Sequence, residues 1–493
     1  MKTNTLDFDA QALREKILDL AMRGKLVPQD PNDEPASVLL EKIKVEKEQL
    51  IKEKKIKKSK PLVPITDEEK PFDIPDSWEW VRLGDVNTYN SESVHPDRTP
   101  DKTFELYSVP IFPTRKPEII KGEEIRSNKQ AVETGDVLLC KINPRINRVW
   151  KVSNFTDNEN IASTEWIVVR QREITTEYLR YSLMAPYFRN LLQSNVSGVG
   201  GSLTRAKPRE VRNYVLPIPP LSEQSRIAAK IAQLFALLRK VESSTQQYAK
   251  LQTLLKSKVL DLAMRGKLIK QDPNDEPASV LLEKIKAEKE QLIKEKKVKR
   301  SKPLPPISDE EKPFEIPDSW EWVRLGDVGL IATGNTPTKN NSDFYGGTTP
   351  FIKPADIQNL IINYNTKDFL SEKGEQKGRL AYKNDILVTC IGNLGRNNII
   401  NRKVAYNQQI NGISPLIVSS SLLHYFMLSS FFISSMYNYA SATTLPILNK
   451  TKLSNLIIPL PPLAEQSRIV DKIEMIFSLF CKDESSTQQY ENL

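Results

Sequence analysis

The chain has 493 residues, and its 71 Lys and Arg against 62 Asp and Glu leave a formal charge of +9. With 27% charged and 39% hydrophobic residues, this is a globular composition rather than a disordered or membrane-embedded one. No run of about 18 apolar residues occurs, so neither a transmembrane helix nor a membrane partner is expected. The first residues lack the apolar core of a signal peptide, which favours a cytoplasmic location. Two His and three Cys leave little material for a zinc site or a Ser-His-Asp triad.

An internal repeat organises the chain. Residues 258–328 repeat residues 16–86 with 62 of 71 positions identical, at an offset of 242 residues. The block 217–227 returns at 459–469 with the same offset. A period this long indicates two large modules and not a solenoid.

The first expected element is a helix around residues 10–24, followed by a Pro-rich linker with a charged helix over 38–58. Because that helix is dense in Lys and Glu, a solvated face is the favoured interpretation. Contact with a partner protein or with DNA flanks is the alternative. The repeat predicts the same linker and helix in the second half.

Two divergent stretches, 89–214 and 331–456, lie between the repeated blocks. They share a turn followed by an apolar strand, at 135–140 and again at 384–390, which indicates a common fold. The first stretch carries 19 basic and 15 acidic residues and the second carries 12 and 6, whereas the repeated framework has a net charge of −1. The basic excess therefore lies in the divergent domains, which is typical of two modules that bind different stretches of a polyanion. Ordinary scatter of charge is the alternative.

A long central helix is predicted over 222–266, starting after a Pro-Pro pair and ending before Gly266. Its apolar residues step by three and four, as in a coiled coil, and its length would be roughly 67 Å. The C-terminal end repeats the first part of this helix and the N-terminal end repeats the last part. The simplest closed arrangement pairs the central helix, antiparallel, with the two terminal helices. The apolar seam comprises Ile227, Ile231, Leu234, Leu238 and Val241, then Tyr248, Leu251, Leu255, Val259 and Leu262.

The predicted fold class is α+β, with two α/β domains separated by a long antiparallel two-helix coiled coil and related by a pseudo-twofold repeat. The expected segments are the N-terminal part of the distal helix (1–26), a charged linker and helix (27–77), a first variable domain (78–214), the central helix (215–268), a second linker and helix (269–319), a second variable domain (320–456) and the C-terminal part of the distal helix (457–493).

Motifs of DNA-modifying enzymes are not found. The Pro-Pro pairs do not form the Asp/Asn-Pro-Pro-Tyr/Phe signature of an amino-methyltransferase, and no phosphate-binding P-loop occurs. Cys140 and Cys390 lie in apolar strands, so they are expected to be buried and inert. The sequence thus predicts no catalytic residues, no metal site and no cofactor in this chain.

Candidate nucleic-acid contacts in the first variable domain follow its apolar strand. Arg and Asn are the side chains that form bidentate hydrogen bonds with guanine and adenine edges. A glycine-rich loop at 197–207 could bring backbone amides and hydroxyls close to phosphates. For any single position a solvated loop is an equal alternative. The candidates are Lys141, Asn143, Arg145, Asn147 and Arg148 after the strand, and Ser202, Thr204, Arg205 and Lys207 in the loop.

Candidates in the second variable domain fall in three stretches of polar and basic residues. The first opens the domain, the second follows its apolar strand, and the third closes it. They are Asn335, Thr336, Thr338, Lys339, Tyr345 and Lys353; then Asn393, Arg396 and Asn397; then Thr443, Thr444, Lys450 and Lys452.

The second domain resembles a known family at these residues. Gly334-Asn335-Thr336-Pro337-Thr338-Lys339, followed by Tyr345-Gly346-Gly347, looks like the opening of a target recognition domain in the specificity (S) subunit of bacterial Type I restriction–modification systems. The two Pro-Pro-Leu-x-Glu-Gln-x-Arg-Ile helix starts, at 219–227 and 461–469, are similar to that family's conserved helical regions. The first domain lacks the Gly-Asn-Thr-Pro opening and would belong to a different specificity type.

The resemblance implies a non-catalytic subunit that recognises double-stranded DNA. Each variable domain would read one half of a bipartite, asymmetric site, and the helices would set the spacing. Two methyltransferase (M) subunits would dock on the repeated framework and restriction/translocation (R) subunits would complete the complex. S-adenosylmethionine, ATP and Mg²⁺ would belong to those partners. Two alternatives stay open, namely the specificity component of a combined methylase–nuclease and a coiled-coil scaffold that binds no nucleic acid.

Overall fold

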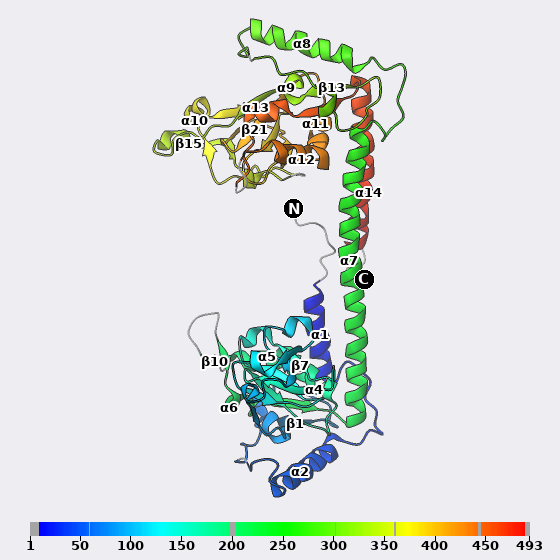
Figure 1. The fold of residues 1–493 in the computed structure, drawn as a ribbon, viewed down its shortest axis with the longest axis vertical. Coiled ribbons are helices and arrows are strands. Elements are labelled where there is room, and N and C mark those ends of the chain that lie inside the picture. Colours follow the sequence, from blue (N-terminus) through cyan, green and yellow to red (C-terminus); the bar gives the residue numbers. More distant parts are fainter. Residues whose placement is uncertain are drawn as a thin grey trace. The chain divides into compact units, whose positions relative to one another are not determined.

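The computed structural model describes residues 9–58, 60–194, 196–197, 204–300, 302–358, 361–441 and 445–488, except the side chains of 197 and 481–488. The described residues divide into two units (Figure 1): the first unit ends at Ser244 and the second unit begins at Thr245. Helix α7 (Leu221–Met264) contributes its first half to the first unit and its second half to the second unit. The helix predicted over 222–266 is therefore present.

The repeated sequence forms the same framework elements in both units, 242 residues apart. In each unit the first strand pairs antiparallel with the last strand in the same register. The first unit contains α2 (Ala36–Lys52), β1 (Glu79–Arg82), α3 (Leu83–Val86) and β12 (Val215–Ile218), and the second contains α8 (Ala278–Lys294), β13 (Glu321–Arg324), α9 (Leu325–Val328) and β22 (Ile457–Leu460).

The linker helix α2 is shorter than the sequence predicts. It ends at Lys52 and not at Lys58, because Lys54 adopts a left-handed φ of 58° and the Lys55 N–H donates to the Leu50 carbonyl at 2.9 Å. This is the common way in which a helix closes its C-terminus. Leu39 and Ile43 are buried against the core while most charged side chains are exposed. The exposed charges agree with a solvated face.

Two sheets form the variable part of the first unit. The strand predicted over 137–140 is β6, buried in the centre of its sheet. The five-stranded sheet has the order β2 (Ser93–Val94), β5 (Lys129–Ala131), β8 (Glu159–Ser163), β3 (Thr103–Tyr107) and β4 (Glu118–Lys121), and the three-stranded sheet has the order β7 (Val149–Lys151), β6 (Val137–Cys140) and β9 (Trp166–Val169). The pair β10 (Val196–Ser197) and β11 (Arg205–Ala206) and the helices α4 (Thr176–Met184), α5 (Pro186–Ser194) and α6 (Pro208–Val211) complete it.

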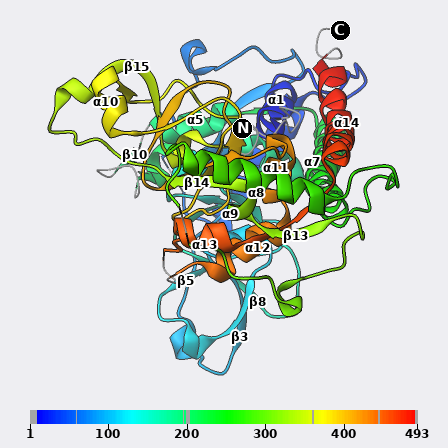
Figure 2. The same ribbon diagram turned by 90° about the horizontal axis from the view of Figure 1, so that it is seen from above.

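Two four-stranded sheets form the variable part of the second unit. The first has the order β14 (Gly329–Thr333), β21 (Ile410–Pro415), β18 (Ile386–Thr389) and β19 (Asn397–Ile399), and the second has the order β16 (Phe369–Leu370), β15 (Tyr345–Ile352), β20 (Val404–Tyr406) and β17 (Arg379–Ala381). The helices are α10 (Glu372–Lys377), α11 (Ser420–Met427), α12 (Ser430–Tyr439) and α13 (Lys450–Asn455). In both ribbon views β15 and α10 lie at the end of this unit remote from α14 (Figures 1 and 2).

The two halves of α7 pack against different helices. In the first unit, α1 (Ala10–Met22) shares a core with the start of α7, and Arg14 pairs with Glu242. In the second unit, Val259 and Leu260 share a core with Ile469 of α14 (Leu463–Gln488). There Lys256 lies over the rings of Phe477 and Phe480, so α7 and α14 run antiparallel.

The predicted apolar seam is buried at its two ends and partly exposed between them. Ile227 and Ile231 are buried, but Val241, Tyr248 and Leu251 are 42%, 47% and 62% exposed. Leu255 is also exposed. The exposed side chains lie between the stretches of α7 that pack against α1 and α14, and pairing along the whole seam stays a prediction.

The repeated Pro-Pro-Leu-x-Glu-Gln-x-Arg motif joins each helix start to its unit. The Glu223 carboxylate accepts hydrogen bonds from Trp78 at 2.9 Å and from Gln29 at 2.6 Å. The Gln224 side chain accepts from the Thr175 N–H at 2.9 Å and donates to the Pro219 carbonyl at 3.0 Å. In the second unit, Glu465 and Gln466 make the corresponding bonds with Trp320, Gln271, Ser419 and Pro461. The identical residues of the motif thus hold two divergent domains in the same way.

Candidate nucleic-acid interface

The loop after β6 and the loop before α6 lie together in the first unit. Their backbones form a bridge between Ile142 and Arg205. The Asn143 N–H donates to the Thr204 carbonyl at 2.8 Å, and the Ala206 N–H donates to the Lys141 carbonyl at 2.9 Å. Two stretches chosen separately from the sequence therefore form one surface.

Three candidates of this surface serve the loop itself. Asn143 and Asn147 have left-handed φ angles of 48° and 47°, which Asn tolerates better than most residues. The Asn147 amide donates to the Leu183 carbonyl of α4 at 3.0 Å, and Arg148 donates to the Ile142 carbonyl at 3.3 Å. These side chains shape the loop, while Arg145 between them is exposed.

Basic side chains gather beside this loop. Lys141, Arg205 and Lys207 line an open hollow together with Arg209, which the sequence analysis missed. Two carboxylates, Glu165 and Glu210, also line it, and Glu165 pairs with Arg205 at 3.3 Å. Arg209 lies on α6, two residues after Lys207, so its closeness in sequence to the predicted basic loop was the available signal. Ser202 lies outside the described residues.

The second unit repeats this arrangement with different residues. After β18 the loop backbone bridges from Ile391 to Ile447, and the Gly392 N–H donates to the Pro446 carbonyl at 2.9 Å. Gly392 and Gly395 take the left-handed positions, with φ angles of 75° and 82°. Asn393 and Arg396 are exposed on this loop. The closing stretch is adjacent, with Lys450 exposed at the start of α13 and Lys452 donating to the Ser441 hydroxyl at 2.7 Å.

Asn397 does not belong to this surface. Its side chain is fully buried, where it donates to the Gly395 carbonyl at 3.0 Å and meets the His424 ring nitrogen at 2.7 Å. Burial lowers the pKa of His424 to about 4, so the ring is neutral near pH 7. We correct the prediction accordingly: Asn397 is an interior residue that supports the loop. Thr443 and Thr444 lie outside the described residues.

The opening stretch of the second domain folds against the end of β20 and the turn that follows it. The Asn335 N–H donates to the Tyr406 carbonyl at 3.1 Å, and the Thr336 hydroxyl donates to Gln408. Thr338 is exposed, and the Tyr345 hydroxyl donates to the Pro337 carbonyl at 2.6 Å. The stretch therefore has a fixed conformation with its polar edge at the surface.

Two lysines of this stretch share one carboxylate. Lys353 contacts Asp368 at 2.6 Å, and Lys339 lies 4.0 Å from it. The hydrogen bond from Lys353 holds the pKa of Asp368 below its ordinary value, so the carboxylate is charged near pH 7. One carboxylate against two ammonium groups leaves this edge cationic.

Gln408 and Gln409 connect the two groups of candidates in the second unit, and the sequence analysis missed both. Gln408 is exposed beside Thr336, and the Gln409 carbonyl accepts from the Cys390 N–H at 3.0 Å, where the other loop begins. Gln is one of the two side chains suited to adenine edges. The isolated Gln-Gln pair carried no motif, and only the fold brings it to the candidate surface.

Cys140 and Cys390 are both buried, as predicted. In the part of the chain that the structure describes, no cluster of three or more His, Cys, Asp or Glu is placed to hold a metal ion. Among the same residues, no helix combines the length and apolarity needed to cross a membrane.

Comparison with known proteins decides the family. The family model of the Type I restriction modification DNA specificity domain matches residues 75–252 and again 317–484. The chain belongs to the Type I restriction–modification specificity subunits. It is 34% identical to the specificity subunit of the EcoAI enzyme of Escherichia coli, over 95% of this chain and 89% of that one. It is 32% identical to the EcoEI specificity subunit of Escherichia coli, over 96% and 90% of the two chains.

Two solved structures share the fold. A chain from a structural study of complex assembly and conformational transition of the type I R-M system matches with a TM-score of 0.60 at 23% identity, covering 86% of this chain and 95% of that one. The HsdS subunit from Thermoanaerobacter tengcongensis matches with a TM-score of 0.53 at 23% identity, covering 84% and 93%. The specificity subunit described here thus has two repeats of mixed helix and sheet, each with one DNA specificity domain.

Proposed function

We propose that this specificity subunit is the DNA sequence-recognition component of a Type I restriction–modification complex. Each variable domain reads one half of a bipartite, asymmetric site. The observation that carries the proposal is the pair of corresponding loop surfaces. Both are held by the same backbone bridge on a nearly identical framework, yet they present different side chains. Different base-reading groups on equal supports suit an asymmetric target.

The helices set the spacing of the two half-sites in this proposal. Helix α7 runs through both units, and the terminal helices α1 and α14 pair with its ends, completing a two-helix coiled coil. Four residues added near the middle of α7 would lengthen the helix by about 6 Å. The gap between half-sites should then grow while the bases of each half stay the same. An unchanged gap would count against the spacing role.

The repeated framework docks two copies of one methyltransferase subunit, because two equal surfaces suit two equal partners. Methylation of adenine and the base flipping that it needs are the work of that partner, and R subunits add cleavage and translocation. S-adenosylmethionine, ATP and Mg²⁺ belong to these partners, and the complex acts in the cytoplasm. The subunit itself contributes recognition and no catalysis.

Exchange of one variable domain tests the proposal. Residues 331–456 are replaced by the corresponding segment of a relative with another target, and 89–214 are replaced in a matched second chimera. Methylated sites are mapped by single-molecule sequencing of cells that express each chimera with the methyltransferase subunit. Each exchange should change one half-site only. Changes in both halves would contradict modular recognition, and absence of any DNA binding by the complex would favour a structural scaffold.

A further inference from the structure

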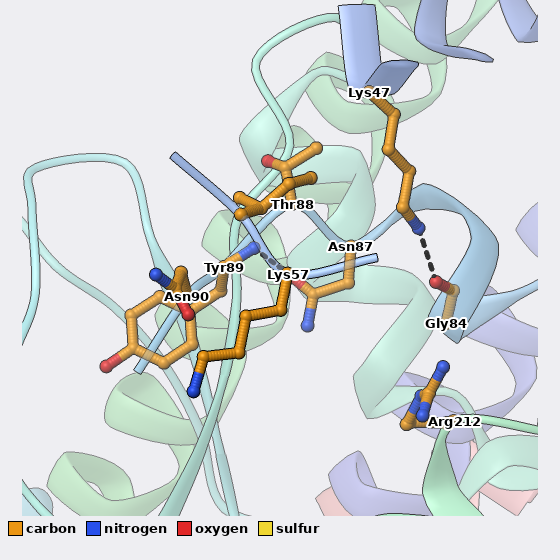
Figure 3. A pocket seen from close by; sticks show the side chains of 9 residues that line it. Lys47, Lys57, Gly84, Asn87, Thr88, Tyr89, Asn90 and Arg212 are labelled. Atoms are coloured by element: carbon orange, nitrogen blue, oxygen red, sulfur yellow. Dashed lines mark hydrogen bonds between the residues drawn. The ribbon is translucent and has the colours of Figure 1, made fainter. Parts of the chain in front are cut away.

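A small cationic hollow lies outside the loop surface of the first unit, between α2 and α3 (Figure 3). We call it the α2–α3 hollow. Its volume is about 190 Å³. Its lining includes Lys47, Lys57, Gly84, Asn87, Asn90 and Arg212.

Lys47 is fixed at the wall of this hollow. Its ammonium group donates to the carbonyls of Gly84 at 2.7 Å and Asp85 at 2.9 Å, at the end of the one-turn helix α3. Arg212 reaches Gly84 by its own backbone, because the Gly84 N–H donates to the Arg212 carbonyl at 2.8 Å. In Figure 3 Lys47 and Arg212 approach Gly84 from opposite sides, and Lys57 lies near Asn87 and Asn90.

The cations of the α2–α3 hollow form no ion pair with the described part of the chain: no carboxylate there lies within ion-pair distance of Lys47, Lys57 or Arg212. Burial is the main cause of a lowered pKa at Lys47; the Asp85 carboxylate opposes the shift and the Arg212 guanidinium adds to it. Three basic groups around one hollow suit an oxyanion, which accepts charge-assisted hydrogen bonds from such groups. The Asn87 and Asn90 amides also line the hollow, and each donates to a backbone carbonyl at 3.0 Å.

The corresponding place in the second unit carries different side chains. Lys289 repeats the bond of Lys47, donating to the Gly326 carbonyl at 2.7 Å, and Lys299 corresponds to Lys57. Arg212 is replaced by Ser454, and the polar run Asn87 to Asn90 is replaced by residues 329–332, Gly-Leu-Ile-Ala. Burial again lowers the pKa of Lys289, but no arginine contributes there. The framework lysines are shared, and the anion-binding groups are specific to the first unit.

A short helix connects the α2–α3 hollow to the loop surface. Arg212 follows α6 directly, and Lys207 precedes it. The turn between them rises about 6 Å, close to two steps of 3.4 Å along one DNA strand. A DNA strand whose phosphates contact Lys207 and Arg209 would therefore reach the α2–α3 hollow within a few nucleotides.

Resting on the proposed function, the geometry points to a DNA backbone phosphate, outside the bases that the first unit reads, as the ligand of the α2–α3 hollow. A volume of about 190 Å³ is below the roughly 300–1,000 Å³ of sites for whole small molecules, so a single phosphate group is favoured over a free nucleotide. The contact carries no sequence information. It adds affinity and extends the footprint on one side of the site only.

The test uses the complex with the methyltransferase subunit and duplexes that contain its mapped target. The variant K57A/R212A removes two exposed cations and leaves Lys47 in place, because Lys47 also supports α3. K299A is the matched control in the second unit. The salt slope of DNA affinity should fall by about one for K57A/R212A and stay unchanged for K299A. Ethylation of phosphates outside the first half-site should weaken the wild-type complex and not the variant.

Further arms separate the outcomes. A duplex trimmed to the end of the first half-site should bind wild type and K57A/R212A equally. Inorganic phosphate, followed by ³¹P NMR line broadening, tests the hollow as a free-anion site; broadening with an unchanged DNA footprint would overturn the DNA assignment. Equal footprints of wild type and variant on the long duplex, with base specificity intact, would overturn the inference and leave the proposed function standing. Loss of all DNA binding in wild type would instead reject the proposed function.

Discussion

The framework and the variable domains of the two units differ in opposite ways. Framework contacts are reproduced almost atom for atom: Arg82 donates to the carbonyls of Val63 and Asn213 at 2.6 and 2.7 Å, and Arg324 donates to those of Pro305 and Asn455 at the same distances. The loop surfaces share only their backbone bridge. The contacts that hold each domain on its framework are thus conserved between the units as side-chain bonds, whereas the candidate surface is conserved only in its backbone bridge. The side chains of the surface are free to differ.

The largest expected effect concerns the framework arginines. Arg324 is buried and pairs with Glu311 as well as with backbone carbonyls, so Arg324→Met leaves several polar groups unpaired. We expect a loss of roughly 3–5 kcal/mol in the stability of the second unit. Hydrogen exchange of β13 and β22, read by mass spectrometry, checks this locally. Arg82→Met should destabilise the first unit in the same way and leave the second unit unchanged. If one substitution destabilised both units equally, the two frameworks would not be separately stable.

The next effect separates base reading from loop support in the first unit. Arg145 is exposed and makes no hydrogen bond or ion pair with the rest of the described chain, whereas Arg148 bonds its own loop. Arg145→Ala should lose about 1–3 kcal/mol of discrimination at one base pair of one half-site. Competition binding with single-base variants of the target measures it. Arg148→Ala should weaken binding to all sequences alike.

Arg396→Ala provides the control in the second unit. It should act at the other half-site, because Arg396 is exposed on the corresponding loop. Discrimination lost at the same base pair by both substitutions would show that the two loops do not read separate halves.

A smaller effect tests strain in the second unit. Ile417 has a φ of 60° and is 40% exposed; a β-branched residue rarely adopts this left-handed conformation. Glu173 is its counterpart in the first unit, because Glu173 and Ile417 each lie two residues before the N–H that donates to Gln224 or Gln466. Glu173 has no left-handed φ. Since Asn tolerates the conformation, Ile417→Asn should stabilise the second unit by up to about 1 kcal/mol. Denaturant titration with a probe in each unit checks this, and Glu173→Asn should be nearly neutral.

Sequence reasoning predicted the framework well because identical blocks at one offset must form identical elements. The long helix, the buried strand before each loop and the buried cysteines were all visible as apolar patterns. The partial exposure of Val241 to Leu255 was not, because apolar spacing does not show how deeply each side chain of a helix is buried. Likewise, nothing in the sequence distinguishes Asn397 from Asn393. Asn397 is buried because the chain turns at Gly395, which has a left-handed φ.

The site residues were harder to predict for a second physical reason. Gln408 reaches the candidate surface through a contact between segments far apart in the chain, the bond from Thr336 to Gln408. No local pattern marks it. The backbone bridge that creates the surface, Ile142 with Arg205 and Ile391 with Ile447, leaves no side-chain signature at all.

The smallest effect compares the two frameworks through pH. The hydrogen bond from Arg82 is the main cause of a pKa of about 2 at Glu69, below its ordinary 4.5, so the ion pair contributes stability above pH 4.5 that is lost as the pH falls toward 2. Glu311 is shifted in the same direction, chiefly by the Ser308 N–H. Glu69 is 41% exposed, so screening limits the contribution to at most about 0.5 kcal/mol. Thermal melting between about pH 5 and pH 3 should fall less steeply in the Glu69→Gln variant than in wild type.

The buried glutamates at the helix starts have pKa shifts of the opposite sign, so they serve as controls for this pH dependence. Burial raises the pKa of Glu223 and of Glu465, so the cost of their ionisation disappears as the pH falls below the raised values. Glu223→Gln should therefore steepen the acid loss that Glu69→Gln reduces, because it removes a group that favours folding in acid. Glu311→Gln and Glu465→Gln should reproduce the two changes in the second unit. If the two kinds of substitution changed the slope in the same direction, the opposite pKa shifts would not be the source of the pH dependence.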